Sequence, residues 1–250
     1  MTHNRIRYAA GTDVGRSRSK NEDSVHVGER VLAIADGMGG HGHGDVASAV
    51  AIGALATLED GQPPEDPVAA IEGAVLEAGR RLSELAERDP AMERMGTTVT
   101  AMLWDGQGRF ALAHVGDSRA YMLREGNLYQ ITRDHTLVQS LVDDGRMSPD
   151  QAARHPSRSL LLRALETSGT ADPDLSLRDA SPGDRYLLCS DGLTAVLDPE
   201  ALHQVLTTVD DPEETVRRLI DLANEGGGPD NISCIVADIE ADTEADTEAG

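Results

Sequence analysis

Aspartate recurs in this chain at the points where short apolar runs begin or end. Runs of this length and composition predict buried strands, so the sequence predicts carboxylates at the rims of a β-sheet core. Two like charges about 4 Å apart, at an effective dielectric constant near 20, repel by roughly 4 kcal/mol. A fold that gathers several of them must therefore neutralise them. The four residues are Asp36, Asp117 and Asp191, each directly after an apolar run, and Asp230, just before one.

A bound divalent cation reduces the repulsion among several carboxylates at once, whereas protonation of one carboxyl group removes only one charge. The available ligands are hard oxygens, which suit Mg²⁺ or Mn²⁺ better than Zn²⁺. One Asp-Gly pair after a strand is more often a simple turn, whereas four such positions in one chain favour metal binding. Two close divalent ions would activate a water and clamp an in-line displacement at phosphorus.

The chain of 250 residues carries a formal charge of −22, from 44 acidic and 22 basic residues. This balance argues against a general nucleic-acid or anionic-membrane binder, because both need a positive surface. Neither a signal peptide nor a membrane-spanning run is visible, so we expect a cytoplasmic protein without membrane or nucleic-acid partners. Three polar or reactive residues inside expected strands, Cys189, Cys234 and His114, are expected to be buried core residues rather than functional groups.

Strand-like and helix-like segments alternate along one expected domain, residues 1–240. Expected strands cover 5–12, 25–35, 97–104, 110–115, 119–123, 128–132, a segment from 185, and 232–239, and expected helices cover 46–58, a long segment from 67, 199–206 and 212–224. Residues 133–170 break this alternation with short helices and charged turns, which predicts an excursion beside the site, called the flap below. The repetitive acidic segment 241–250 is expected to be a disordered, solubilising tail.

A phosphate substrate also needs an orienting cation, and the charged segment 13–23 offers Arg18. The planar guanidinium fork of arginine matches two phosphate oxygens. Arg18 lies four residues before Glu22, so the two side chains could border one pocket. Considered alone, the segment is more simply interpreted as a charged turn.

Six short motifs occur in one order, and together they resemble the metal-dependent protein serine/threonine phosphatases of type 2C, the PPM family, in its bacterial branch. They are Arg18-x-x-Asn21-Glu22-Asp23, Asp36-Gly37-Met38-Gly39-Gly40, Gly96-Thr97-Thr98, Val115-Gly116-Asp117-Ser118-Arg119, Ser190-Asp191-Gly192 and Gly228-Pro229-Asp230-Asn231. The resemblance covers about residues 7–239. It implies an α+β fold of four layers, an αββα sandwich in which helices flank two central antiparallel β-sheets, with the flap near the active site.

The resemblance also implies a metal centre with two core ions, Mn²⁺ or Mg²⁺. Asp36 is expected to bridge both ions and the Gly37 carbonyl to bind one of them, while Asp191 and Asp230 bind the other. Asp117 matches a position linked to a third, weaker ion that is shared with Asp191.

Four further residues receive supporting roles from the same resemblance. Arg18 matches the phosphate-binding arginine. Glu22 matches an outer-sphere carboxylate that reaches a metal through water, and Asp23 is expected to support it. Asn231 is expected to orient the loop that carries Asp230.

The chain departs from the family pattern at two places. Met38 stands where many eukaryotic members have a histidine that is a candidate general acid, so the proton donor to the leaving group is not carried over. His41 and His43 lie nearby, and an exposed glycine-rich turn is the favoured interpretation of both. Glu166 follows Arg163-Ala164-Leu165 where bacterial members usually have glycine, so the resemblance does not extend to the conformation of the flap.

The implied activity is metal-dependent hydrolysis of phosphoserine and phosphothreonine monoesters on proteins. A metal-bridging hydroxide would attack in line without a covalent phosphoenzyme, and the enzyme would oppose bacterial Ser/Thr kinases. Expected partners are phosphorylated proteins and these kinases, and the expected state is a monomer. Two alternatives stay open at this point: a phosphatase restricted to one phosphorylated regulator in a sigma-factor switch, and a non-catalytic phosphoprotein-binding module. The second alternative predicts missing metal ligands.

Overall fold

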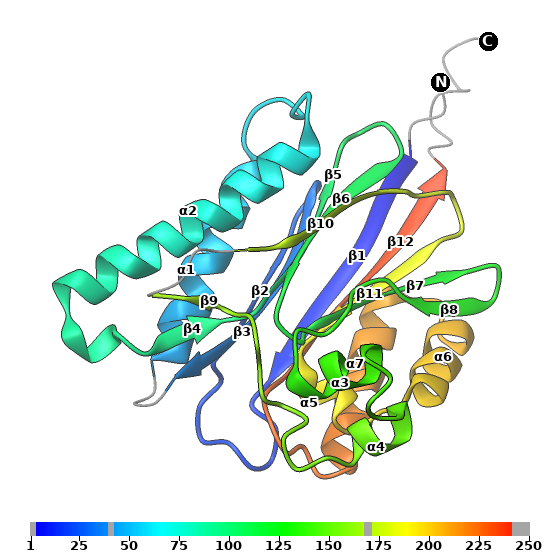
Figure 1. Cartoon of the computed structure of the whole chain (residues 1–250). Helices are drawn as coiled ribbons and strands as arrows, with labels where there is room; N and C mark the ends of the chain where they lie inside the picture. Colours follow the sequence, from blue (N-terminus) through cyan, green and yellow to red (C-terminus); the bar gives the residue numbers. More distant parts are fainter. Residues whose placement is uncertain (1–3, 40–42, 168–171, 242–250) are drawn as a thin grey trace, which may run out of the picture.

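The computed structural model of the chain describes residues 4–39, 43–167 and 172–241. Two antiparallel sheets pack face to face, and helices cover the outer face of each sheet (Figure 1). The predicted four-layer αββα sandwich is therefore confirmed. Among the described residues, no helix has both the length and the apolar character needed to cross a bilayer.

The first sheet has five strands and places the two longest side by side. β1 and β12 pair along their whole lengths, from Asn4 opposite Ala241 to Asp13 opposite Ile232. At the other end of the sheet, Glu125 and Gly126 connect β7 and β8 with positive φ angles of 51° and 75°, the conformation that suits a two-residue hairpin. The order of strands is β1 (Asn4–Asp13), β12 (Ile232–Ala241), β11 (Arg185–Cys189), β7 (Arg119–Arg124) and β8 (Asn127–Gln130).

The second sheet has seven strands, and it differs in places from the expected elements. The segment expected as one strand, 25–35, is a hairpin of two strands that turns at 28–30, and the strands β9 and β10 were not expected. Its order is β10 (Asp174–Asp179), β6 (Arg109–Val115), β5 (Val99–Trp104), β3 (Val31–Gly39), β4 (Met95–Thr97) and β9 (Leu165–Glu166), with β2 (Asp23–Val27) paired to β3.

Both faces of β3 are buried, which explains its continuous apolar sequence. Leu32 and Ile34 pack between the two sheets, whereas Val31, Ala33 and Ala35 pack under the helices that cover the second sheet. Successive side chains of a strand point to opposite faces, so a strand buried on both sides cannot alternate apolar with polar residues. The central layer between the sheets therefore holds the end of β3 firmly in place.

Two long helices cover each sheet, and their ends follow the local sequence. α1 (Gly44–Ala56) and α2 (Pro67–Arg88) pack on the second sheet, and α6 (Pro199–Thr208) and α7 (Pro212–Glu225) pack on the first. Asp66 caps α2 as predicted, since its side chain accepts bonds from the backbone N–H groups of Val68 and Ala69. The shorter helices are α3 (Leu137–Asp143), α4 (Pro149–Ala153), α5 (Asp191–Thr194) and the 3₁₀ turns η1 (Thr57–Glu59) and η2 (Pro90–Met92).

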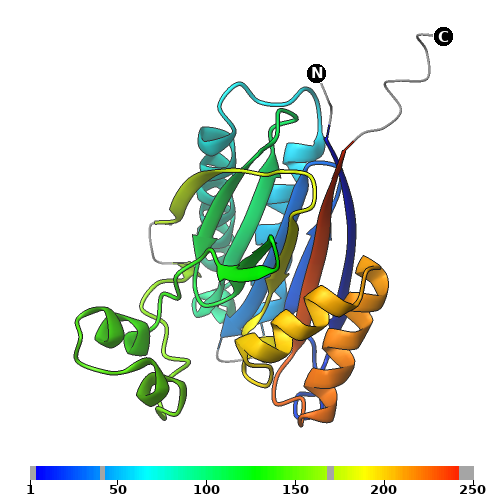
Figure 2. The same ribbon diagram turned by 90° about the vertical axis from the view of Figure 1, so that its right-hand side faces the viewer.

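The flap projects from the body of the sandwich and carries α3 and α4 (Figure 2). Its two ends lie together, because Thr136 forms an isolated β-bridge with Leu161. The expected range 133–170 also includes β9, which pairs with β4 of the second sheet. The expected tail, 241–250, has its first residue in β12, and the remainder lies outside the described residues.

Candidate metal centre

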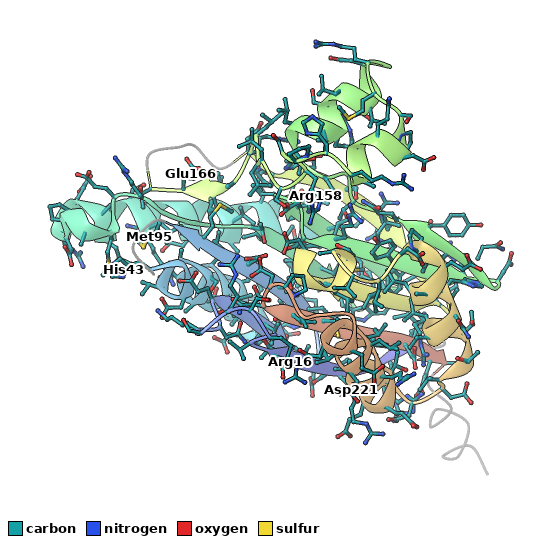
Figure 3. The ribbon with its side chains drawn as sticks, turned by 90° about the horizontal axis from the view of Figure 1, so that it is seen from below. Arg16, His43, Met95, Arg158, Glu166 and Asp221 are labelled. Atoms are coloured by element: carbon teal, nitrogen blue, oxygen red, sulfur yellow. The ribbon has the colours of Figure 1, made fainter. Side chains whose placement is uncertain are left out.

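Five aspartates from segments of both sheets lie close enough to act on one another. Figure 3 shows the molecule from below, with side chains drawn as sticks. Asp36 lies near the end of β3 and is the centre of the group. Its pKa is raised well above the usual value, first by burial and then by the charges of Asp23, Asp191, Asp117 and Asp230. The structure therefore brings together every aspartate that the sequence placed at the rim of a core strand.

The neighbours of Asp36 show the same mutual repulsion. Burial and the charges of Asp191 and Asp134 raise the pKa of Asp117 to about 7. Burial raises the pKa of Asp23 to about 6, even though two hydroxyl hydrogen bonds oppose the shift. Burial and the charge of Asp230 also raise the pKa of Asp191. An added cation would reverse all of these shifts, because opposite charge favours the ionised carboxylate.

Several carboxylate oxygens at this end are buried without a hydrogen-bond partner in the described part of the chain. They are Glu22 Oε1, Asp23 Oδ1 and Asp191 Oδ1. Across the described residues, no group of three or more His, Cys, Asp or Glu side chains is arranged so that it could hold a metal ion as it stands. The fit to Mg²⁺ or Mn²⁺ is instead chemical: the donors are hard oxygens, they repel one another, and some lack any other partner.

The backbone of Asp36 is held by the threonines of the Gly96-Thr97-Thr98 motif. Its N–H donates to Thr98 Oγ1 at 3.0 Å, and its carbonyl accepts from Thr98 N and Thr97 Oγ1, both at 2.9 Å. The next residue must be glycine, because a Cβ at Gly37 would lie 2.1 Å from the carbonyl oxygen of Gly44 at the start of α1. Close packing of the backbone therefore explains the glycine of the Asp-Gly pair.

A second glycine brings the Asp191 and Asp230 loops together. A Cβ at Gly192 would lie only 1.9 Å from the carbonyl oxygen of Asn231, so this approach needs glycine. The Asn231 side chain then joins three backbone segments: Oδ1 accepts from Glu22 N at 2.9 Å, and Nδ2 donates to the carbonyls of Val14 at 3.1 Å and Lys20 at 2.9 Å. The loop that carries Arg18 is thus fastened to the loop that carries Asp230.

The sequence analysis assigned no role to two serines that contact Asp23. Ser190 Oγ and Ser233 Oγ both donate to Asp23 Oδ2, at 2.8 and 2.7 Å. Asp23 begins β2 of the second sheet, Ser233 lies in β12 of the first sheet, and Ser190 directly follows β11 of the first sheet, so these bonds join the two sheets. The available signal was their position, since Ser190 directly precedes Asp191 and Ser233 follows Asp230 by three residues.

Arg18 stands at the mouth of the aspartate group with its side chain 52% exposed. Its Nη2 donates to Asp230 Oδ2 at 2.7 Å. That hydrogen bond raises the pKa of Arg18, and the charges of Asp230, Asp36 and Asp191 add to the effect. The guanidinium is accessible to solvent and faces the carboxylates, a position from which it can receive an anion.

Asp117 lies in the turn between β6 and β7, and His135 fixes that turn. The N–H of Gly116 donates to His135 Nδ1 at 3.1 Å, and the His135 N–H donates to the Gly116 carbonyl at 2.8 Å. His114 behaves as a satisfied core residue, as expected: its ring nitrogens contact Thr100 Oγ1 and the Arg133 carbonyl, each at 3.0 Å. Burial lowers its pKa to about 4.

Of the two histidines near Met38, one lies outside the described residues. That residue is His41. His43 stands directly before α1, and its side chain makes no capping hydrogen bond to the helix.

The two-sheet sandwich and the aspartates gathered at one of its ends also match known proteins. The family model described as protein phosphatase 2C matches residues 10–225. The chain belongs to the protein phosphatase 2C family.

Curated relatives carry the names of serine/threonine protein phosphatases. Over 236 residues the chain is 50% identical to the serine/threonine protein phosphatase PstP of Mycobacterium tuberculosis, covering 94% of this chain and 45% of that protein. The chain thus spans less than half the length of this relative. It is 34% identical to the serine/threonine phosphatase stp of Listeria innocua, covering 91% of this chain and 93% of the relative.

Solved structures agree with this family membership. The crystal structure of the Mycobacterium tuberculosis phosphatase PstP/Ppp superimposes with a TM-score of 0.91 at 49% identity, covering 94% of this chain and 99% of that one. The catalytic domain of PstP in complex with 2 manganese ions gives a TM-score of 0.89 at 47% identity, covering 95% and 99%.

Proposed function

We propose that this chain hydrolyses phosphoserine and phosphothreonine monoesters on proteins with two bound divalent ions, Mn²⁺ or Mg²⁺. The observation that carries the proposal is the buried group of mutually repelling aspartates around Asp36. Family membership supports it, as does the likeness to a phosphatase domain in complex with manganese. The alternative of a non-catalytic binding module predicts missing ligands, whereas the sequence contains every proposed carboxylate.

The carboxylates that repel one another around Asp36 support a set of ligands for two neighbouring ions. Asp36 would bridge them, the Gly37 carbonyl would bind one, and Asp191 and Asp230 would bind the other. Asp117 would contribute to a third, weaker site. When bound, the ions supply a nucleophilic water near neutral pH and positive charge at the phosphoryl oxygens.

The residues of this chain would position the substrate and support the ligands. Arg18 would receive two phosphate oxygens, because its guanidinium is exposed and remains charged beside Asp230. Glu22 offers a buried oxygen without a protein partner, which suits an outer-sphere contact. Asp23 and Asn231 would hold the loops in register through the hydrogen bonds described above. Met38 offers no proton, so the leaving alkoxide would take its proton from water or from an acid other than residue 38.

Phosphorylated proteins are the proposed substrates, bound through an extended segment that reaches the exposed rim of the site. The partners would be bacterial Ser/Thr kinases and their targets. The relatives in Mycobacterium and Listeria are named as serine/threonine phosphatases, which supports phosphoprotein substrates. A cytoplasmic location and a monomeric state follow as further parts of this proposal.

The decisive experiment replaces Asp36 with Asn. Hydrolysis of a phosphothreonine peptide and of an aryl phosphate is measured against Mn²⁺ concentration, and Mn²⁺ binding is measured separately by calorimetry. We expect turnover to fall by at least about a thousandfold, because the ligand shared by both ions is lost, and we expect Mn²⁺ binding to weaken.

Asp221→Asn is the matched control, because it removes the same charge on an exposed position of α7. This variant should retain wild-type turnover. Full Mn²⁺-dependent activity in Asp36→Asn would refute the bridging role, and an inactive wild-type protein that still binds phosphopeptide would favour the binding-module alternative.

A further inference from the structure

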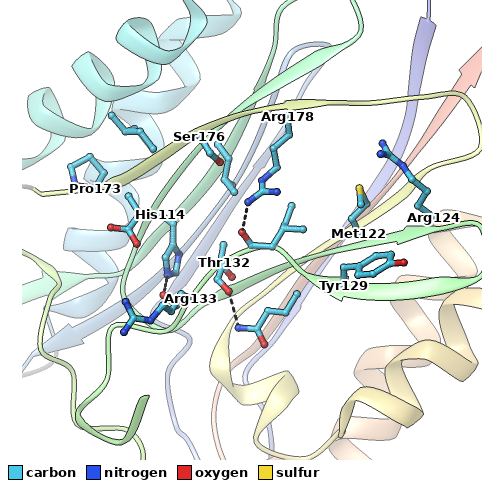
Figure 4. Close-up of a pocket in the computed structure, with 14 residues that line it drawn as sticks. His114, Met122, Arg124, Tyr129, Thr132, Arg133, Pro173, Ser176 and Arg178 are labelled. Atoms are coloured by element: carbon cyan, nitrogen blue, oxygen red, sulfur yellow. Dashed lines mark hydrogen bonds between the residues drawn. The ribbon is translucent and has the colours of Figure 1, made fainter. Parts of the chain in front are cut away.

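A cleft opens where the two sheets diverge, between strands β8 and β10. Its volume is about 910 Å³, and residues of β6, β7, β8 and β10 and of the segment 131–133 line it (Figure 4). This volume is within the range of roughly 300–1,000 Å³ that ligand sites in proteins occupy. None of the proposed metal ligands lines the cleft, so it is separate from the metal centre.

The floor of the cleft is apolar, and its rim is basic. Leu112 and Met122 come from the inner faces of the two sheets and belong to the edge of the core between them. Three arginines line the cleft against a single carboxylate, that of Asp174. This local excess of positive charge contrasts with a chain whose formal charge is −22.

The three arginines differ in how they are compensated. Arg124 forms two hydrogen bonds with Asp184, at 2.7 and 2.6 Å, and Arg133 is paired with Asp143. Arg178 forms no ion pair with a described carboxylate. Its Nη2 donates to the Ile131 carbonyl at 3.1 Å across the cleft, and its buried Nε has no hydrogen-bond partner among the described residues. Arg178 is therefore the side chain with most to gain from an incoming carboxylate.

Both walls of the cleft are edge strands. β8 pairs only with β7, and β10 pairs only with β6, within the part of the chain that the structure describes. Their outer edges therefore present backbone groups that an extended segment can use, as in recognition by strand addition. Figure 4 shows Arg178 between these walls, with Arg133 towards one end of the cleft and Arg124 towards the other.

One end of the cleft is linked to the metal centre through a short chain of hydrogen bonds. Asp174, on the cleft wall, accepts a hydrogen bond from His135 Nε2 at 3.1 Å. His135 in turn holds Gly116, the residue directly before Asp117. Of the two ends of the cleft, the end at Asp174 is therefore the one joined to the Asp117 turn.

We propose that the cleft between β8 and β10 binds an extended, acidic segment of the phosphoprotein substrate, with Arg178 as the carboxylate receptor. This inference rests on the proposed phosphatase function and names the kind of substrate that this function prefers. Apolar side chains of the segment lie on Leu112 and Met122, its backbone runs along an edge strand, and an Asp or Glu pairs with Arg178. The phosphorylated residue of the same chain occupies the metal centre.

The test uses the whole chain loaded with Mn²⁺ and two probes. The first is a fluorescent, unphosphorylated Asp/Glu-rich peptide, whose binding is measured by anisotropy. The second is a pair of phosphothreonine peptides that carry either an acidic or a neutral extension. Arg178→Gln should weaken binding of the acidic probe about tenfold and raise KM for the acidic phosphopeptide by a similar factor. Its kcat and its hydrolysis of an aryl phosphate should be unchanged.

Two variants provide matched comparisons. Arg178→Lys keeps the charge without the planar fork and should recover part of the binding. Arg218→Gln removes the same charge from an exposed position on α7 and should behave as wild type. Added salt should weaken binding of the acidic probe, because part of the attraction is electrostatic.

Each result has a definite meaning. No saturable binding of the acidic probe to the wild type, or equal binding to wild type and Arg178→Gln, would overturn the proposal. Weaker probe binding with unchanged KM would overturn the role in substrate binding. Loss of aryl phosphate hydrolysis by the wild type with Mn²⁺ would instead refute the underlying phosphatase function.

Discussion

Removal of one carboxylate from the metal centre should stabilise the metal-free protein. Asp117→Asn is the sharpest test, because burial and the charges of Asp191 and Asp134 raise the pKa of Asp117 from 3.8 to about 7. At 1.36 kcal/mol per pKa unit, this difference corresponds to about 4 kcal/mol of native-state destabilisation once the group is ionised. Neighbouring carboxyl groups can take up a proton in place of Asp117. We therefore expect Asp117→Asn to raise the free energy of unfolding by about 2 to 4 kcal/mol at pH 8.

The pH dependence has a definite sign. Between pH 3.8 and about 7, the native state binds more protons at Asp117 than the unfolded state does, so stability falls as pH rises through this window. The increase in the free energy of unfolding caused by Asp117→Asn should therefore be largest at pH 8 and fall to about 1 to 2 kcal/mol at pH 5. Saturating Mn²⁺ should reduce or reverse this increase, because the wild type would then gain more from the bound ions.

Urea unfolding in the presence of a chelator, at pH 5 and pH 8, measures these differences directly. Asp221→Asn is again the control, since Figure 3 shows Asp221 on the outside of the molecule, and it should change stability by less than about 0.5 kcal/mol. A metal-free Asp117→Asn protein no more stable than wild type at pH 8 would refute the claim that these carboxylates strain the fold.

Three further substitutions test separate parts of the site. Arg18→Ala should raise KM for a phosphopeptide about tenfold with a smaller effect on kcat, because it removes a ground-state contact; unchanged kcat/KM would exclude phosphate contact. Asn231→Ala should lower the free energy of unfolding by about 2 to 4 kcal/mol, because three backbone groups lose their partner; urea unfolding measures the loss, and a change below about 0.5 kcal/mol would contradict it. Gly192→Ala should weaken Mn²⁺ binding measured by calorimetry, because its Cβ would meet the Asn231 carbonyl; wild-type affinity would show that the two loops can separate without cost.

The layered fold and the aspartates could be predicted because both depend on strong local signals. The apolar run 31–35 is buried on both faces, and Asp36 directly follows it, although β3 continues to Gly39. The division of 25–35 into β2 and β3 was missed because the turn at 28–30 has only one glycine to mark it. Apolar residues on both sides of that turn conceal the hairpin.

Elements whose stability comes from distant partners could not be predicted. β10 is half exposed and lies at a sheet edge, so its sequence signal, Leu175 and Leu177 alternating with polar residues, is weak. β9 has two residues and exists because β4 stands beside it. The roles of Ser190 and Ser233 could not be predicted for the same reason, because no local sequence pattern shows that both contact Asp23. The basic cleft is likewise formed by strands that lie far apart along the chain.

The flap leaves and rejoins the body of the protein at almost the same place. Backbone hydrogen bonds join Gly116 to His135 and His135 to Leu162, so the two ends of the excursion are held beside each other. A loop anchored in this way can change in length and sequence while its attachment points stay fixed. Descendants of a common ancestor can therefore diversify the α3–α4 segment without rebuilding the carboxylate site, and chimaeras that exchange residues 137–161 should retain the rest of the architecture.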